Sequence, residues 1–343
     1  GENHPFTMVT MSNLAKDYCD NGSFDKATTL LESAVESMQG KFGDKNPTAM
    51  MLRNNLADLY RRNGQITKSR IQLEELLPVS REVLGEKQIG TLVIMNNLAI
   101  TYWEMGDTEK AYDMTEETYR IRKEVLSAHH PHTLASMANL AKFHRHAGRA
   151  ERALPLLEDA LELSRSKHGM QNPTTLKLMG GLAKTYEAID RFRDAEAQRK
   201  LIIDQLRESS PNSIDLANAL AELANHRMAQ GNLEQAEELA RDCLELYEEN
   251  RLPQHWQFAD AQRVLGATLF ARSQSAKKQS FGQRLAEAEK LLGAACKGLE
   301  AQFLTIPRGD KHRFRLALES IVQLYEFRSN EGDLELADPW NKK

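Results

Sequence analysis

The sequence has little of what would indicate a disulfide-rich, membrane-spanning or phosphoryl-transferring protein. Its three cysteines, Cys19, Cys243 and Cys296, are widely separated and follow no metal-ligand spacing, so we expect reduced packing residues. No apolar run approaches the roughly 18 to 20 residues of a membrane span. The glycine-rich loop, His-Arg-Asp and Asp-Phe-Gly motifs of protein kinases are absent too. We therefore expect this chain to have no enzymatic activity of its own.

Charge of one sign and aromatic residues are also scarce. The 45 lysines and arginines nearly balance the 49 acidic residues, so the net charge is −4 and nucleic acid is not the expected partner. Aromatic residues make up 6% of the chain, whereas apolar residues reach 41%. This balance is typical of helices that pack closely through Ala, Leu and Met. We expect a cytoplasmic protein without a cofactor or membrane insertion.

A step of 42 residues runs through the sequence. Leu-Ala pairs stand at 14–15, 56–57, 98–99, 140–141 and 182–183, and glycines at 22, 64, 106 and 148 keep the same spacing. The pair at 223–224 comes one residue early, and Leu265-Gly266 restores the step. A fixed period of this size indicates a solenoid, in which each unit buries its apolar face against its neighbours. Its functional surface is expected to be the long concave face.

Each unit has the pattern of two helices joined by a tight turn. Apolar residues recur at spacings of three and four within 11–18 and again within 24–38. Gly22 between these segments permits the positive φ of a helix-to-helix turn. Asn46-Pro47 places an N-cap residue before a proline at the first helical position of the next unit. Alanines occupy the places where helices must approach closely.

The order of Leu-Ala, Tyr three residues later, Gly four further and Ala five further resembles the tetratricopeptide repeat (TPR). The long step, the Asn-Asn-Leu-Ala segments at 54–57 and 96–99 and the Gly-x-x-x-Pro loops are similar to the TPR array of kinesin light chain and its bacterial relatives. The resemblance covers about residues 1–250. It implies an all-α, TPR-like α-solenoid: about seven or eight antiparallel helix pairs in a right-handed superhelix with a C-terminal capping unit.

From about residue 250 the sequence resembles a narrower group. His255-Trp256, the segment 264–267, the helix-like run 286–292, Ile306-Pro307 and the segment 315–326 follow in that order. The succession is similar to the extreme C-terminal tail of multidomain bacterial serine/threonine kinases with TPR extensions. It implies six repeats over 1–250, followed by divergent terminal repeats and capping helices over 251–343.

Two further expectations concern the ends of the chain. Gly1 to Pro5 matches the loop from Gly43 to Pro47, so the sequence starts inside a repeat motif and is expected to be a fragment of a longer protein. The last ~90 residues are expected to close the apolar end of the array. The residues expected to do so are Trp256, Leu265, Leu318, Ile321 and Tyr325.

A ladder of asparagines is the clearest functional feature. Asn13, Asn55, Asn97 and Asn139 stand one residue before the repeated Leu, at a position that faces the groove in TPR proteins. Stacked carboxamides can hold the backbone of an extended peptide through both donor and acceptor atoms. The alternative is that they bond only to neighbouring helices. Gly181 and Glu222 take the next two places and end the ladder.

Other groove positions suggest the character of a ligand. An apolar patch beside a basic one would suit an acidic peptide with one hydrophobic anchor. The alternative is a mixed, solvated surface whose lysines have no partner. The residues concerned are Ile100, Trp103, Lys142, Arg145, Lys177 and Lys184.

Two other sets of residues are given structural interpretations. Five histidines lie within eighteen residues, at 129, 130, 132, 144 and 146, but His130-Pro131 repeats a loop motif and His144 replaces a packing Tyr, so no metal site is expected. The basic residues of a second helix are expected to be exposed: Lys110, Arg120, Arg122 and Lys123.

The sequence therefore predicts a protein–protein interaction scaffold or peptide-binding module. The first hypothesis is the regulatory C-terminal tail of a bacterial serine/threonine kinase. The second is a stand-alone peptide-sensing receptor or adaptor without a kinase. An enzyme with an unrecognised site is a third, for which no nucleophile–base pair can be argued.

Overall fold

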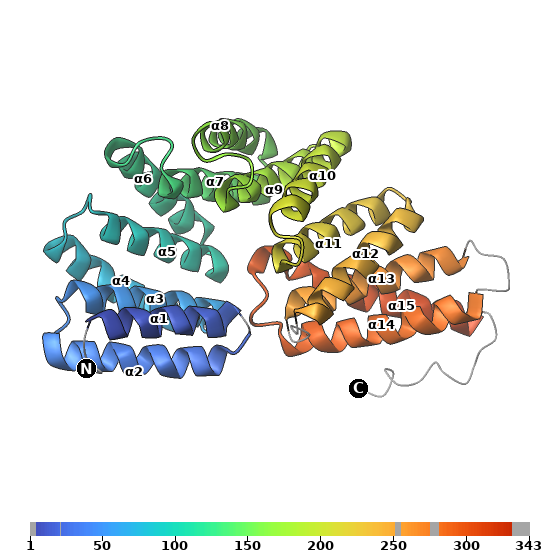
Figure 1. The fold of residues 1–343 in the computed structure, drawn as a ribbon, viewed down its shortest axis with the longest axis horizontal. Helices are drawn as coiled ribbons and strands as arrows, with labels where there is room; N and C mark the ends of the chain where they lie inside the picture. The colour runs from blue at the N-terminus through green and yellow to red at the C-terminus, as the bar shows by residue number, and fades with distance from the viewer. Residues whose placement is uncertain (1–4, 21, 251–254, 275–280, 331–343) are drawn as a thin grey trace. The chain divides into compact units, whose positions relative to one another are not determined.

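The computed structural model describes residues 5–20, 22–250, 255–274 and 281–330, and these residues form α-helices with one short 3-10 helix and no strand (Figure 1). The elements are α1 (Pro5–Asp20), α2 (Phe24–Phe42), α3 (Pro47–Arg62), α4 (Ile66–Val83), α5 (Ile89–Met105), α6 (Thr108–Val125), α7 (Pro131–His146), α8 (Ala150–His168), α9 (Pro173–Ala188), α10 (Phe192–Ser209), α11 (Ile214–Ala229), α12 (Leu233–Glu249), α13 (Trp256–Gln274), α14 (Phe281–Ala301), η1 (Arg308–Asp310) and α15 (His312–Asn330). Seven consecutive pairs and a final helix confirm the predicted all-α repeat array.

The chain divides into two compact units, residues 1–198 and 199–343, with the division inside α10. This division follows compactness, whereas the boundary expected at residue 250 follows the type of repeat, so that boundary stays a prediction. None of the helices in the described ranges has both the length and the apolar character needed to cross a membrane.

In the N-terminal unit the first helices of successive pairs form one row. Helix α3 contacts both α1 and α5, and α7 contacts α9 (Figure 1). Each second helix packs between its own partner and the first helix of the next pair, as α2 does with α1 and α3. The first helices therefore share one face of the unit, and this face carries the asparagine ladder.

Alanines at the repeat step allow this close packing. Ala57, Ala99, Ala141 and Ala183 of the first helices are at most 1% exposed, and Ala111 and Ala153 of the second helices are fully buried. A larger side chain at these places would have no room, because protein interiors are close-packed. The predicted register of small residues is confirmed.

The turns and helix caps lie where the sequence pattern predicts them. Gly106 ends α5 at φ +95°, and its N–H bonds to the carbonyl groups of Tyr102 and Trp103. In the fifth repeat Asp190 takes the same place at φ +59°, in the left-handed region where a non-glycine residue is strained. Asn46 and Asn172 cap α3 and α9 by accepting hydrogen bonds from backbone N–H groups, as predicted.

In three repeats a hydrogen bond joins the first helix to the second helix of the preceding pair. A tyrosine hydroxyl donates to a glutamate 28 residues earlier in three repeats: Tyr60 to Glu32 at 2.6 Å, Tyr102 to Glu74 at 2.9 Å and Tyr186 to Glu158 at 3.2 Å. Burial, followed by the bond to Glu74, raises the pKa of Tyr102 to about 12. These tyrosines stay protonated and act as hydrogen-bond donors between repeats.

His144 takes the tyrosine place in the fourth repeat. It is 8% exposed, and its ring meets the edge of Tyr112 at a centroid distance of 5.3 Å. Burial is the main reason that the pKa of His144 lies below its ordinary value of 6.5. The charges of Arg152 and Arg149 lower it further, and Glu116 opposes them. The imidazole is therefore neutral in the folded protein near neutral pH.

The C-terminal unit has its own core, built where α13, α14 and α15 meet α11 and α12. Leu265 and Ile321 are 2% and 4% exposed, and Trp256 and Tyr325 pack against this core while partly buried. Leu318 was expected in the same cluster, but it is 38% exposed. That expectation is wrong because α15 turns Ala317, Ile321 and Leu324 inward, and Leu318 lies roughly a quarter turn away, at the edge of this buried stripe.

Ala153→Leu should lower the free energy of unfolding by roughly 1–3 kcal/mol, because the added side chain overpacks the contact between α7 and α8. Asp159→Leu on the exposed face of α8 is the matched control and should change stability little. Chemical denaturation measures both. Equal stability of the two variants would contradict the assigned packing.

His144→Tyr should stabilise the protein, and the gain should grow from about pH 7 to about pH 5. Because the folded-state pKa of His144 is depressed, the unfolded chain binds a proton more readily below about pH 6.5, and stability is lost as the pH falls. Tyrosine removes this proton uptake and offers Glu116 a hydroxyl. Denaturation curves of both proteins at the two pH values measure the difference, and a gain that does not depend on pH would count against it.

Truncation after Asn250 should cause self-association, because it uncovers the faces of α11 and α12 that meet α13 to α15. Ala224 and Ala240, both at most 1% exposed, would become part of an apolar surface. Size-exclusion chromatography with light scattering measures the effect. A truncated chain that stays monomeric and equally stable would show that the last three helices are an independent appendage.

Candidate functional site

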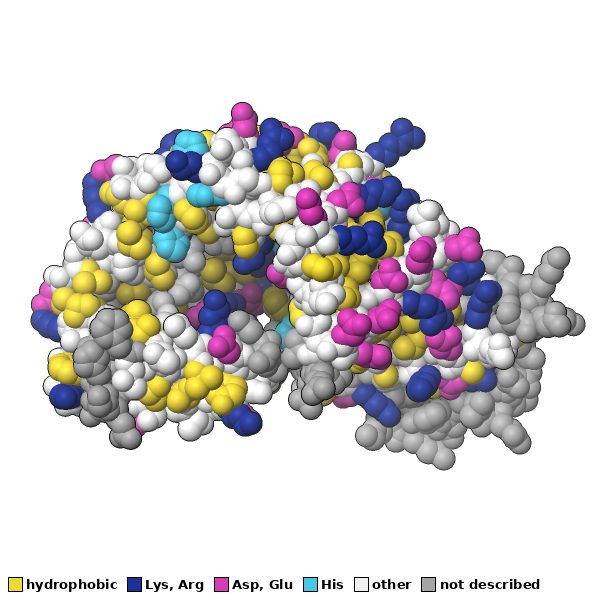
Figure 2. Space-filling model, viewed as in Figure 1, with side chains coloured by type: hydrophobic (Ala, Val, Ile, Leu, Met, Phe, Trp, Pro, Cys, Tyr) yellow, Lys and Arg dark blue, Asp and Glu magenta, His cyan; other side chains and the backbone are white. Residues whose placement is uncertain are grey.

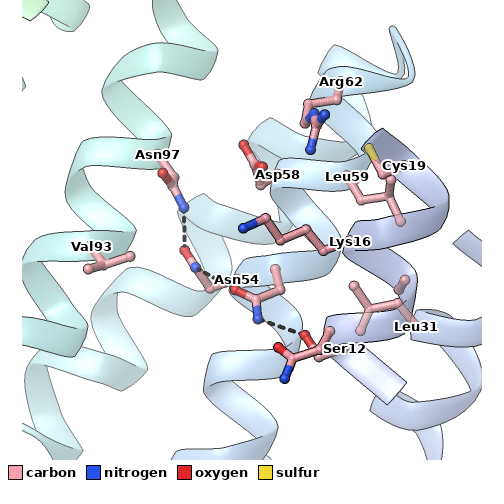
Figure 3. Close-up of a pocket in the computed structure, with 13 residues that line it drawn as sticks. Ser12, Lys16, Cys19, Leu31, Asn54, Asp58, Leu59, Arg62, Val93 and Asn97 are labelled. Atoms are coloured by element: carbon pink, nitrogen blue, oxygen red, sulfur yellow. Dashed lines mark hydrogen bonds between the residues drawn. The ribbon is translucent and has the colours of Figure 1, made fainter. Parts of the chain in front are cut away.

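A groove of about 300 Å³ lies on the face formed by α1, α3 and α5 (Figure 3). Three members of the predicted ladder, Asn13, Asn55 and Asn97, line it together. Its other lining residues are Ser12, Ala15, Lys16, Cys19, Leu31, Asn54, Asp58, Leu59, Arg62 and Val93. The structure thus brings the ladder of the first three repeats into one concave site.

Hydrogen bonds connect the carboxamides across the repeats. Asn97 Nδ2 donates to Asn54 Oδ1 at 2.9 Å, Asn54 Nδ2 reaches Asn55 Oδ1 at 3.4 Å, and Asn55 Nδ2 donates to Ser12 Oγ at 2.9 Å (Figure 3). Asn55 and Asn97 therefore each use the amide nitrogen to bond to the preceding repeat. This agrees with the alternative in which the ladder bonds neighbouring helices. Asn97 Oδ1 accepts from no described residue, whereas Asn55 Oδ1 accepts from Asn54.

The ladder continues one step beyond this groove. Asn139 Nδ2 on α7 donates to Asn96 Oδ1 on α5 at 3.2 Å. The acceptors in two steps, Asn54 and Asn96, directly precede ladder residues in the sequence. The Asn-Asn pairs at 54–55 and 96–97 were the available signal, because one asparagine of each pair can bond to the preceding repeat and the other to the following one.

The groove also contains charged groups of both signs. Lys16 and Arg62 line it from α1 and α3, together with Asp58. Asp58 is paired with Arg61, whose Nη2 lies 2.7 Å from Asp58 Oδ1. Val93 supplies an apolar side chain from α5, and Ile100, seven residues later on the same helix face, is half-buried.

Trp103 does not form the open apolar receptor that the sequence suggested. It is 4% exposed, and its ring stacks on Phe143 at a centroid distance of 4.7 Å and an angle of 22°. His146 lies 5.1 Å from the Trp103 ring, and Lys142 Nζ lies 5.7 Å from the ring centroid. The indole is covered because Phe143 on the next first helix packs against it. Trp103 is therefore a core residue beneath the groove face and is not open to a ligand.

The predicted basic residues lie on the next two first helices. Lys142 and Arg145 are half-buried on α7, Lys184 is half-buried on α9, and Lys177 is exposed on α9. They follow the groove along the row of first helices and are not part of its lining. Figure 2 shows histidine side chains gathered over α6 and α7 among apolar and basic ones.

The histidines have structural contacts. His130 Nδ1 accepts from the backbone N–H of His132 at 3.2 Å and caps α7, and a ring nitrogen of His168 lies 3.0 Å from the carbonyl oxygen of His129. Within the described ranges no group of three or more His, Cys, Asp or Glu side chains has the arrangement of a metal site. Burial and the nearby Arg122 charge lower the pKa of His132.

Arg122 is a buried residue of α6, although the sequence suggested exposure. It is 1% exposed and lies between α5 and α7. Its guanidinium donates to the carbonyl oxygens of Leu92 at 2.8 Å and His132 at 2.9 Å, to Ser136 Oγ at 2.8 Å and to Asn96 Oδ1 at 3.3 Å. Burial lowers the pKa of Arg122 to about 10, so the group stays charged.

The repeat register contained the signal for this burial. Met38, Ser80 and Ser164 occupy the position of Arg122 in other repeats, and all are fully buried. A position inside the core must stay inside whatever residue it carries, because the helix face is fixed by the register. The expectation that Arg122 is exposed was based on its residue type alone and neglected its position in the repeat.

In the C-terminal unit the corresponding inner positions hold a buried ionic network. Glu222, at the sixth ladder place, pairs with Arg313 of α15 at 2.5 Å and with Arg199 at 3.3 Å. Asp260 pairs with Arg263 at 2.7 Å and also with Arg313. Burial acts to raise the pKa of Asp260, but the two arginines hold it below its usual value. These positions are occupied by partners from the same unit.

Comparison with known proteins agrees with the repeat geometry. One family model described as tetratricopeptide repeat matches residues 47–124 and 125–204, and a second of the same description matches residues 7–48 and 216–256. The fold and the ladder define an all-α repeat protein of helix pairs. The chain belongs to the tetratricopeptide-repeat family, and its structural neighbours include TPR proteins of the kinesin light chain type.

Solved structures share the fold at low sequence identity. A protein from Podosopora anserina described as a kinesin light chain with nearly identical TPR-like repeats is 24% identical, with a TM-score of 0.50 over 61% of this chain and 98% of that one. A Rap protein complexed with competence and sporulation factor is 10% identical, with a TM-score of 0.53 over 94% and 99%. A signal transduction ATPase from Pyrococcus horikoshii with a TPR sensor is 15% identical, with a TM-score of 0.59 over 96% and 49%.

A search of curated protein sequences gave no match.

Proposed function

We propose that the N-terminal unit binds an extended peptide segment of a partner protein along the row formed by α1, α3, α5, α7 and α9. The groove of about 300 Å³ lined by ladder asparagines carries this proposal. Carboxamides repeated at the helix step match the repeated polar groups of a peptide backbone, and a concave surface contacts a chain along its length. The protein acts as an interaction scaffold, and catalysis is no part of this role.

The proposed ligand is acidic and carries one apolar side chain. Lys142, Arg145, Lys177 and Lys184 follow the groove along the same row, and their positive charges would attract carboxylates. The apolar side chain of the ligand contacts Val93 and Ile100, since Trp103 is covered by Phe143.

A finer proposal concerns the protein that contains this chain. The order of segments between residues 255 and 326 resembles the TPR tail of multidomain bacterial serine/threonine kinases. On this basis the chain is the regulatory tail of a cytoplasmic kinase, where the groove recruits substrates or regulators. The parent gene tests this directly, because it should encode a kinase domain with a glycine-rich loop upstream of Gly1.

A peptide-sensing receptor without a kinase is the second candidate. The Rap protein structure that supports it is a complex with competence and sporulation factor, and it matches this fold over nearly the whole of both chains. Such a receptor would change conformation when the peptide binds, whereas a scaffold would stay the same. Small-angle scattering with and without the bound peptide separates the two.

A peptide array followed by fluorescence titration tests peptide binding itself. The array should return acidic peptides that bind the full chain. Basic binders, or binders that cross-link to the second helices, would contradict the assignment of the groove.

Charge reversal of Lys142 and Lys184 to Glu should slow association with an acidic array peptide and reduce its dependence on salt, with less effect on dissociation. The reason is that charges at the rim act mainly on the encounter rate and are screened by ions. Lys41→Glu and Lys123→Glu, on second helices of the same unit, are the matched controls. Stopped-flow measurements at low and high salt record the rates, and equal slowing by the control pair would argue for a non-specific charge effect.

A further inference from the structure

Arg122 differs from the other buried arginines of the described residues. Four arginines are less than a tenth exposed, and Arg199, Arg263 and Arg313 each pair with a carboxylate. Arg122 donates only to neutral oxygens: two backbone carbonyls, a hydroxyl and a carboxamide. A buried charge without a counter-charge is costly, so a stabilising role is a poor explanation of this residue.

The neighbouring repeats show what Arg122 replaces. At its position Ser80 and Ser164 each lie 2.8 Å from a threonine hydroxyl, of Thr91 and Thr175 respectively. Thr133 is the corresponding threonine of the repeat after Arg122, and its buried hydroxyl has no hydrogen-bond partner. With arginine at this position, the contact between α6 and α7 lacks the Ser–Thr hydrogen bond of the adjacent repeats and also buries a charge, and both are unfavourable.

In return, Arg122 fixes the direction of two carboxamides. An arginine can only donate, so Asn96 must turn its Oδ1 toward Arg122, and Asn139 must then donate its Nδ2 to the same oxygen. The chain of bonds between α1 and α5 has no such constraint, because it ends at the Ser12 hydroxyl, which can donate or accept. Within the ladder, only the hydrogen bond between Asn139 on α7 and Asn96 on α5 has its donor and acceptor fixed by a charged group.

The fixed orientation leaves Asn96 Nδ2 and Asn139 Oδ1 available to a ligand. Asn96 and Asn139 are both half-buried. Asn96 Nδ2 donates to no other described residue, and Asn139 Oδ1 accepts from none. The pair offers one donor and one acceptor from adjacent first helices, which complements the C=O and N–H groups of a peptide backbone. The nearby positive charge makes Asn96 a stronger donor.

We infer that Arg122 is a positioning residue that orients Asn96 and Asn139, so that this step of the ladder presents a fixed donor and a fixed acceptor to the backbone of a bound peptide. The inference rests on the proposed peptide-binding function and adds a specific subsite to it. It also explains why a costly residue stands where the two adjacent repeats have a serine.

The variant Asn96→Asp distinguishes the orienting role of Arg122 from a purely structural one, because it should change stability and peptide binding in opposite directions. The carboxylate keeps both acceptor contacts and gives Arg122 a counter-charge, so the melting temperature should rise by roughly 2–4 °C. The same change removes the donor, so binding of an acidic array peptide should weaken by about tenfold or more. The peptide with Gln in place of every Glu controls for charge repulsion and should also lose affinity. A simple structural role would move stability and binding in the same direction.

Arg122→Ser is the matched variant, since it restores the serine of the neighbouring repeats and offers Thr133 a partner. It should fold with unchanged or higher melting temperature and bind the neutral peptide several-fold more weakly. Adding Asn96→Asp in this background should no longer raise the melting temperature, because the counter-charge has no arginine to pair with.

Differential scanning fluorimetry and fluorescence anisotropy on the full chain measure these effects. Destabilisation by Asn96→Asp, or wild-type affinity for the neutral peptide in that variant, would overturn the inference. If the wild-type chain binds no array peptide while Asn96→Asp is still stabilising, the proposed function fails and the donor role is lost with it, but the orientation by Arg122 stands.

Discussion

The close approach of helices at every repeat is the constraint on which the rest of this structure depends. Alanines at the 42-residue step are fully or almost fully buried, so successive first helices lie close enough for side chains 43 residues apart to bond, as Asn97 and Asn54 do. Each unit buries its apolar face only against its neighbours. Within the N-terminal unit the inner positions of the first helices form one row, and the groove is a section of it.

Polar groups inside this packing distinguish the two compact units. In the C-terminal unit, buried arginines meet carboxylates at the inner positions, and Arg313 joins α15 to Glu222 and Asp260. In the N-terminal unit the inner positions hold neutral carboxamides and half-buried lysines, and the one buried arginine meets only neutral oxygens. Charges that pair inside the protein attract a ligand weakly. A carboxamide atom such as Asn139 Oδ1, which accepts from no described residue, remains available. The proposed binding surface therefore lies in the N-terminal unit.

The ladder shows that structural and binding roles can be combined in one side chain. A carboxamide has a donor nitrogen and an acceptor oxygen. In Asn97 and Asn139 the nitrogen joins neighbouring repeats, and in the proposed function the oxygen contacts the ligand. Bonds between repeats hold each amide in a defined orientation, which reduces the entropy lost when a peptide binds. The two interpretations of the asparagines that the sequence left open are compatible.

The sequence by itself determined the helices, their turns, the small residues at close contacts and the repeat family, because these depend on local patterns that recur at a fixed step and on contacts between adjacent units. Only the tertiary structure decided the burial of Trp103, the hydrogen-bond partners of Arg122, the exposure of Leu318 and the direction of the carboxamide bonds. Each of these depends on which side chain of the neighbouring helix lies opposite: Phe143 covers the indole, and the carbonyls of α5 and α7 enclose the guanidinium. A periodic pattern defines the face of a helix, but the atoms that meet there are set by the packing of two different repeats.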